Sequence, residues 1–311
     1  MSMSYLKEIE NLTDTIKNDP TNFQARRELT VALLDKGFNE EAIKQLSYLI
    51  TVFPEDARLH YNLGIAWDKI RNFKQALKAY ENALSYEPEE PDFLYNIGYV
   101  YLEMEENDKA IHYFSKVLEK DENDANCYFN LGVCYRNKND SQNAIMYFSK
   151  ALELNDKDIL ASFYLACEYQ KIGDEELAQS QYAKVIENCP DYSWAYFNLA
   201  SMAYKEKNYE KAIEYLEKTL ELNPKDIEAY KIYSKVLYIT GEMYRAEEVL
   251  KQALQHNPYC GDLYYYLAKL AQKNDDVEAY IEYLEQAIEN EETLTVPIKS
   301  VKIELKKAQS L

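Results

Sequence analysis

Hydrophobic residues recur along the chain in pairs of segments that each have the spacing of an amphipathic α-helix. The segment 57–90 illustrates the pattern, with one apolar stripe over 58–70 and a second over 74–86. The stripes are formed by Leu59, Leu63, Ala66 and Trp67 in the first segment and by Ala76, Leu77, Tyr80, Ala83 and Leu84 in the second. A break at Asn72 and a Pro-containing end at 87–91 predict two antiparallel helices joined by a short turn.

This pattern repeats every 34 residues without insertion. Prolines mark the interval at Pro20, Pro54, Pro88, Pro190, Pro224 and Pro258, and alanines mark it at Ala42, Ala76, Ala110, Ala144, Ala178, Ala212 and Ala246. The predicted repeats are 23–56, 57–90, 91–124, 125–158, 159–192, 193–226, 227–260 and 261–294. Such regularity predicts one all-α solenoid, 1–311, in which each helix pair buries its second face against the next.

A column of small residues in the first helices explains how the helices fit together. It contains Gly64, Gly98, Gly132, Ala166, Ala200 and Ala268, and we expect it to face the large residues Tyr80, Phe114, Phe148 and Tyr182 of the second helices. Glycine inside a helix costs about 1 kcal/mol relative to alanine, so its repeated use indicates close helix packing.

The order of these residues resembles the tetratricopeptide repeat. Leu63-Gly64 followed by Trp67, then Ala76, Tyr80, Ala83 and Pro88 carry the resemblance, which extends over nearly the whole chain. It implies a right-handed superhelix with a concave inner groove formed mainly by the first helix of each pair. Two repeats depart from the pattern: Thr30 replaces the glycine of the first, and Tyr280 replaces the alanine of the eighth, where we expect a looser helix pair.

The two ends are predicted to be capping helices, within 1–22 and 295–311. The C-terminal segment carries Ile298, Val301 and Leu305 on one face and four lysines elsewhere. A cap needs one apolar and one polar face. The alternative interpretation is a basic helix that binds a partner.

Composition narrows the classes of function. The formal net charge of −19 disfavours nucleic acid as a partner. The first residues lack a signal-peptide pattern, no apolar run is long enough for membrane insertion, and the five cysteines form no CxxC pair, so we expect a cytoplasmic protein with reduced thiols. The sequence contains no catalytic, metal-binding or cofactor motif, which predicts a protein that is not an enzyme and has no cofactor.

The remaining stripe of the first helices is the candidate peptide-binding groove. Its middle position is Asn62, Asn96, Asn130 and Asn198 in four repeats, and Tyr61 and Tyr95 begin a neighbouring aromatic column. An asparagine ladder offers donors and acceptors to the backbone of an extended peptide. Alternatively, the asparagines bond neighbouring helices, and the aromatic side chains pack between repeats.

Charge in this groove differs from that of the whole chain. In the last four repeats Lys171, Lys205, Lys231, Lys235, Lys269 and Lys273 outnumber Glu228 and Asp262, whereas earlier cations such as Arg136 are balanced by carboxylates. The later half of the groove is therefore predicted to receive an acidic segment or a carboxylate terminus.

Together these patterns predict a scaffold for protein–protein interaction that binds an extended or helical segment of a partner protein. Two alternatives remain: self-assembly, with an end of one molecule docked in the groove of another, and an accessory subunit of an enzyme complex.

Overall fold

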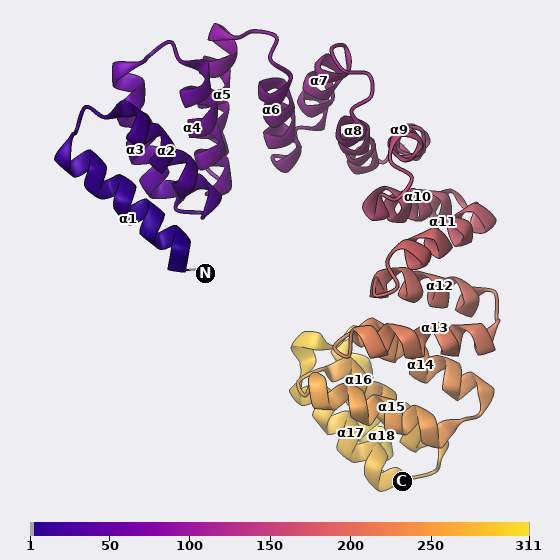
Figure 1. Ribbon diagram of the computed structural model, residues 1–311. Helices are drawn as coiled ribbons and strands as arrows, with labels where there is room; N and C mark the ends of the chain where they lie inside the picture. The colour runs from indigo at the N-terminus through magenta and orange to yellow at the C-terminus, as the bar shows by residue number, and fades with distance from the viewer. Residues whose placement is uncertain (1–2, 311) are drawn as a thin grey trace. The chain divides into compact units, whose positions relative to one another are not determined.

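A computed structural model describes residues 3–310 and confirms the all-α prediction: that range contains eighteen α-helices and one short 3₁₀ helix (Figure 1). In chain order they are α1 (Met3–Asn18), α2 (Phe23–Asp35), α3 (Asn39–Val52), α4 (Ala57–Lys69), α5 (Phe73–Tyr86), α6 (Pro91–Glu103), α7 (Asn107–Leu118), α8 (Ala125–Asn137), α9 (Ser141–Leu154), α10 (Ile159–Ile172), α11 (Glu175–Asn188), α12 (Ser193–Lys205), α13 (Tyr209–Leu222), α14 (Ile227–Thr240), α15 (Met243–His256), α16 (Gly261–Lys273), α17 (Val277–Glu289), η1 (Glu291–Thr293) and α18 (Ile298–Ala308).

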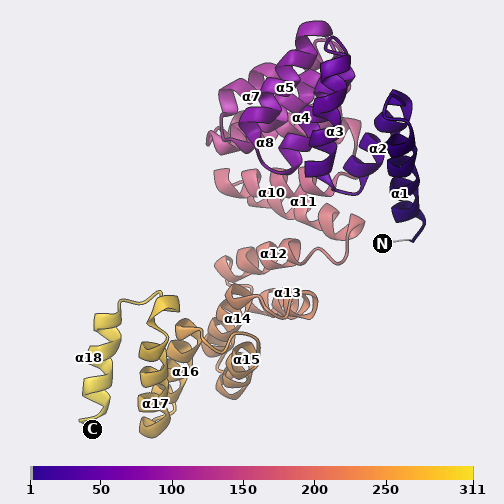
Figure 2. The ribbon, with the colours of Figure 1, turned by 90° about the vertical axis from the view of Figure 1, so that its left-hand side faces the viewer.

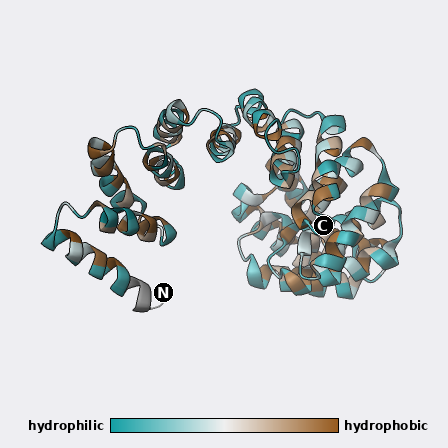
Figure 3. Ribbon diagram, turned by 45° about the horizontal axis from the view of Figure 1, so that its top comes forward, coloured by the Kyte–Doolittle hydropathy of each residue, from teal (hydrophilic) through white to brown (hydrophobic). Residues whose placement is uncertain are grey.

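Each predicted repeat contains one helix pair, and consecutive helices pack side by side from α1 to α9 and from α11 to α18. Residues 1, 2 and 311 of the predicted caps lie outside the described range. The chain divides into two compact parts after Ala161, here called the N-terminal and C-terminal units, and each is described by itself. Within both, hydrophobic and hydrophilic residues alternate along individual helices, as expected for helices that bury one face (Figure 3).

The turn inside every helix pair has the same backbone conformation. One residue per repeat adopts a left-handed φ between 58° and 87°, and the next residue is the N-cap of the second helix. These residues are Gly37, Arg71, Glu105, Asn139, Gly173, Lys207, Gly241 and Asp275, again 34 apart. The amide after each of them donates to the carbonyl five residues earlier at 2.8–3.0 Å, as Asn72 does to Trp67. This is the Schellman motif, which satisfies carbonyls at the helix end.

The glycines of the small-residue column lie where the sequence placed them. A Cβ added at Gly64 or Gly132 would lie 2.4 or 2.6 Å from the nearest ring atom of Tyr80 or Phe148 in the paired helix. Both rings are fully buried. In the sixth repeat the same two positions are Ala200 and Leu216. The fifth repeat has Ala166 and Tyr182 at these positions, and both are fully buried.

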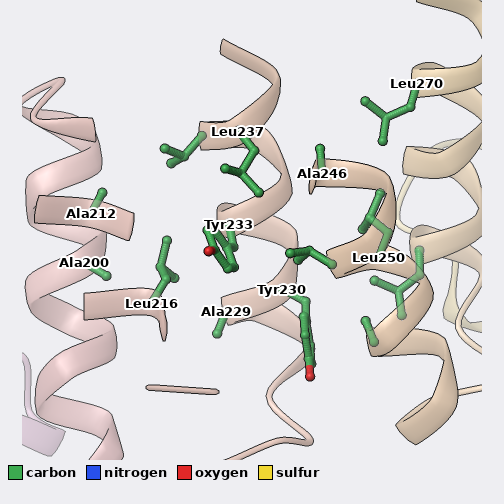
Figure 4. Packing of buried hydrophobic residues seen from close by; sticks show 14 of the residues in the cluster. Ala200, Ala212, Leu216, Ala229, Tyr230, Tyr233, Leu237, Ala246, Leu250 and Leu270 are labelled. Carbon is green, nitrogen blue, oxygen red and sulfur yellow. The ribbon is translucent and has the colours of Figure 1, made fainter. Parts of the chain in front are cut away.

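The alanine column lies on the other side of the same contacts. In the C-terminal unit Ala212 and Ala246 are fully buried beside Leu216, Leu237 and Leu250 in one continuous cluster (Figure 4). Such close packing leaves little room for a larger residue at these positions.

Tyr280 replaces this alanine without loosening its helix pair, contrary to the expectation from the sequence. Its side chain is 5% exposed, and its hydroxyl lies 3.2 Å from Oε2 of Glu304 in α18. Figure 2 shows α16, α17 and α18 side by side. The larger side chain therefore fills space beside the capping helix, where no further helix pair follows in the described range.

The contact between Gly132 and Phe148 generates a test of this packing. In the wild-type background Gly132→Ala should destabilise the protein by about 1 kcal/mol, because an overpacked core costs more than the gain in helix propensity. In a Phe148→Leu background the same change should stabilise by about 1 kcal/mol, since the space for a methyl group then exists. Urea unfolding of the four proteins measures both values. An equal effect of Gly132→Ala in the two backgrounds would show that the ring does not limit this position.

The left-handed turn residues generate a second test. Lys207 is exposed, and for a residue with a Cβ this conformation costs about 1–2 kcal/mol. Replacement by glycine removes that strain but adds freedom to the unfolded chain, so Lys207→Gly should stabilise by about 0.5–1 kcal/mol. The matched change Gly173→Ala should lower the melting temperature. A lower melting temperature for Lys207→Gly would contradict the shared turn conformation.

Candidate functional site

In the N-terminal unit the asparagine and tyrosine columns bond to each other. The Nδ2 of Asn96 donates to the hydroxyl of Tyr61 at 2.9 Å and to the carbonyl of Asp92 at 2.8 Å, and the Nδ2 of Asn130 donates to the hydroxyl of Tyr95 at 2.9 Å. Asn130 is buried. These amide donors therefore link consecutive first helices, which is the structural alternative that the sequence left open.

The two tyrosines are also packed between repeats. The ring of Tyr61 lies 4.8 Å from that of Phe93 in the next repeat. The ring of Tyr95 lies 5.6 Å from that of Phe114 in its own repeat and packs against the cluster that contains Cys127 and Leu131 of the following repeat. Burial raises the pKa of both phenols. Their rings contribute to the interface between adjacent helix pairs and expose only part of their area.

The other two asparagines, Asn62 and Asn198, have no tyrosine at the equivalent position of the preceding repeat. Asn198 is half-buried and donates to the carbonyl of Trp194 in its own helix at 2.7 Å. The residue 35 positions before it is Phe163, which has no hydroxyl group. Asn62 is half-buried, and its counterpart 35 positions earlier is Arg27, which forms an ion pair with Asp56 at 2.7 Å. Arg136 is half-buried in the last turn of α8.

Lys231 has a different environment from the exposed groove position expected from the sequence. It is 7% exposed, and its Nζ lies 2.8 Å from Oε1 of Glu228 and 2.8 Å from Oδ2 of Asp262. The other oxygen of Asp262 accepts from the backbone and side chain of Thr295. The lysine therefore joins α14, α16 and the segment that leads to α18, and its charge is neutralised inside the fold.

The pKa values follow from this network. Burial opposes ionisation of Asp262, but the bonds from Lys231 and Thr295 outweigh it, so the pKa of this carboxyl lies below its ordinary value. Burial also opposes the charged form of Lys231, and its two carboxylate partners hold its pKa above the ordinary value.

The C-terminal unit contains an apolar hollow on the first-helix surface of α12, α14 and α16. Its volume is about 230 Å³. The apolar and aromatic lining consists of Tyr204, Tyr238, Ile239, Leu250, Tyr266 and Leu270. Ser234, Lys235 and Lys269 complete the lining. Tyr238 and Ile239 are 40% and 48% exposed, so the hollow opens to the surface.

Lys235 is the cation available at this hollow. It is exposed, and its Nζ lies 5.1 Å from the ring centre of Tyr266. Lys269, by contrast, is paired with Glu304 at 2.6 Å; burial opposes its charge, but this carboxylate raises its pKa. The two lysines of the hollow therefore have different roles.

The charges on α12, α14 and α16 show which other lysines of this surface have no carboxylate partner. Together α12, α14 and α16 contain five lysines and two carboxylates. Both carboxylates are bound by Lys231, and Lys269 is bound by Glu304. Among the described residues no carboxylate lies within ion-pair distance of Lys205, Lys235 or Lys273. An acidic partner would meet three uncompensated ammonium groups.

Sequence reasoning identified Lys205 and Lys235 but not the hollow that Lys235 lines. One sequence feature could have predicted an apolar surface in this region: in the asparagine column, the seventh and eighth repeats have Ile232 and Tyr266 instead. A second signal was the pair Tyr204 and Tyr238, 34 residues apart. Within residues 3–310 no group of histidine, cysteine and carboxylate side chains could hold a metal ion, and no helix there has the length and apolarity needed to span a membrane.

Comparison with known families agrees with this architecture. Four tetratricopeptide repeat models match at residues 28–71, 72–105, 90–157 and 193–226, and the chain belongs to the tetratricopeptide repeat family. No enzyme family is among these matches. No curated protein sequence matches the chain.

Solved structures with the same fold include three informative relatives. YrrB, described as a TPR protein with an unusual peptide-binding site, is 27% identical over 59% of this chain and 95% of its own, with a TM-score of 0.51. MamA is 25% identical over 53% of this chain and 97% of its own, with a TM-score of 0.50. PilF of Pseudomonas aeruginosa is 19% identical over 68% of this chain and 96% of its own, with a TM-score of 0.59, and shows the fold alone.

The buried ion pair generates a prediction about stability and pH. Asp262→Asn should destabilise by about 3 kcal/mol at neutral pH, because it leaves Lys231 buried with only an exposed partner. Since the folded pKa of Asp262 is depressed, its contribution is present above the ordinary carboxyl pKa of 3.8 and is lost as pH falls through the folded value. The difference between wild type and variant should therefore shrink in acid. Thermal unfolding from about pH 2 to 8 measures it.

The matched control is Glu228→Gln, which removes the other carboxylate partner of Lys231. The side chain of Glu228 is 63% exposed, so this change should cost at most about 1 kcal/mol. Equal losses of stability for the two variants would show that the buried pair with Asp262 stabilises the protein no more than the exposed pair with Glu228.

Proposed function

We propose that the protein is a non-enzymatic scaffold that binds an extended segment of a partner protein on the first-helix surface of its C-terminal unit. The observation that carries the proposal is the juxtaposition of the apolar hollow with Lys235, which lines it; the exposed Lys205 and Lys273 lie at the ends of α12 and α16, two of the helices that form the hollow. An apolar side chain of the segment occupies the hollow, and an acidic group next to it pairs with Lys235.

Two properties of the site favour a short segment over a small-molecule substrate. The hollow is open, and its lining contains no histidine, cysteine or carboxylate that would serve acid–base or nucleophilic chemistry. The flanking lysines lie on three different helices, which suits a ligand that crosses several repeats. A peptide-binding site on YrrB supports this assignment by similarity.

The asparagines of the N-terminal unit are not included in the proposed contact surface. Asn96 and Asn130 use amide donors on the adjacent tyrosines, so a peptide would have to compete with an existing hydrogen bond. Lys231 is also excluded from the contact surface, because its ammonium group is buried in an ion pair with Asp262.

The proposal is tested with fluorescent ten-residue peptides that contain one leucine or phenylalanine beside three glutamates. These peptides should bind more tightly than their glutamine counterparts, and the preference should weaken with salt. Lys235→Glu should weaken binding about tenfold, which corresponds to about 1.4 kcal/mol. Fluorescence anisotropy measures the dissociation constants.

The control is Lys184→Glu, which changes the net charge equally at an exposed position of α11 outside the hollow. It should leave binding within about twofold of wild type, because Lys184 does not line the hollow and salt screens an exposed charge that makes no direct contact. Equal effects of the two variants, or no preference for acidic peptides, would reject the proposed site.

A further inference from the structure

The C-terminal helix α18 has one face anchored to the fold and one face open. Val301 and Ala308 are buried, and the carboxylate of Glu304 accepts from Lys269 at 2.6 Å and from the hydroxyl of Tyr265 at 3.2 Å. The only acidic residue of α18 is thereby used inside the C-terminal unit. The helix cannot turn its anchored face outward without breaking these bonds.

The open face of α18 carries a basic pattern with one apolar residue at its centre. Lys299, Lys302, Ile303 and Lys306 are all exposed and follow the spacing i, i+3, i+4, i+7, so they lie on one stripe. Ile303 is 55% exposed. We call these four residues the basic face. It contrasts with a chain whose net charge is −19.

The N-terminal unit contains a hollow with the opposite pattern. It lies at α1 and α2, has a volume of about 480 Å³ and is lined by Ile9, Val31 and Ala32. Val31 is 50% exposed, although it is a large apolar residue. We call this the acidic hollow because three carboxylates line it.

Those carboxylates are Glu8, Glu28 and Asp35, and two cations also line the hollow, Arg27 and Lys36. Arg27 forms an ion pair with Asp56 at 2.7 Å, so its charge is offset within the unit. Glu28, Val31 and Asp35 follow one stripe of α2 with the spacing i, i+3, i+7.

The two stripes match when their helices run antiparallel. Placing Ile303 opposite Val31 puts Lys306, three residues after Ile303, opposite Glu28, three residues before Val31. It also puts Lys299, four residues before Ile303, opposite Asp35, four residues after Val31. With a rise of about 1.5 Å per residue, both pairs keep the same axial separation from the central contact. In parallel orientation the intervals do not match.

We propose that the basic face of α18 in one copy of this chain docks in the acidic hollow of a second copy. The contact is heterologous, because the two surfaces differ and each copy carries one of each. Association therefore continues beyond the dimer in an open, head-to-tail manner. One helix in one hollow is a small contact, and the large net negative charge opposes it, so assembly is expected at high protein concentration and depends on salt.

The experiment is a charge exchange measured by sedimentation velocity over a range of protein concentrations. The wild-type mass should rise with concentration beyond that of a dimer. Lys299→Glu with Lys306→Glu should abolish the rise, and so should Glu28→Lys with Asp35→Lys. A mixture of the two double variants should regain assembly, because each altered surface then meets its complement on the other protein.

Two further measurements separate this interface from a folding defect or a general charge effect. The four substituted residues are exposed, so circular dichroism and the melting temperature should remain close to those of wild type. Lys184→Glu with Lys211→Glu, a matched change at exposed positions of second helices, should leave assembly unchanged. A wild-type monomer at every concentration overturns the proposal. Failure of the mixed variants to assemble overturns it as well.

Discussion

The close contact between a small residue of each first helix and a large residue of its partner is the constraint on which the structure depends. At Gly132 the backbone approaches the ring of Phe148 so closely that no side-chain carbon fits between them. This contact sets the distance between the helices of a pair. The left-handed turn, such as that at Arg71, sets their connection. With both fixed, every repeat has the same length and offers the same surface to the next, so the core can grow by addition of identical pairs.

Because packing uses two sides of each first helix, only one stripe remains for interactions. In the second to fourth repeats this stripe is closed by hydrogen bonds from Asn96 to Tyr61 and from Asn130 to Tyr95. Such bonds hold consecutive repeats in register and leave few groups for a ligand. In the seventh and eighth repeats Ile232 and Tyr266 replace the asparagine, and the bonds are absent at these positions because neither residue has an amide group. Of these two residues, Tyr266 lines the apolar hollow beside Lys235.

The sequence alone predicted the helix pairs and the small-residue contacts, because the same pattern of residues recurs every 34 positions. It did not predict the left-handed turn, since Arg71, Glu105 and Lys207 have no preference for that conformation and only the geometry of the pair imposes it. It also left the role of Lys231 open. Five lysines can be counted on α12, α14 and α16, but which of them meets Asp262 depends on contacts between repeats. Lysines that look equivalent in the repeat pattern differ in their burial and in their ion-pair partners, and the pattern contains no information on either.

In a solenoid of similar repeats, residues that differ from those at the equivalent positions of the other repeats make the contacts that are specific to this protein. Tyr280 leaves the alanine column, and its hydroxyl meets Glu304, which also binds Lys269 and so fixes the capping helix. Lys231 leaves the aromatic column, and its charge ties two helix pairs to the segment before that cap. Both departures stabilise the C-terminal end, where the described stack lacks a following pair. The same anchoring orients Ile303 and its neighbouring lysines outward. The capping helix α18 therefore has two effects. Its buried face covers the last helix pair, and because that face is held in place, its opposite face is exposed at the end of the stack.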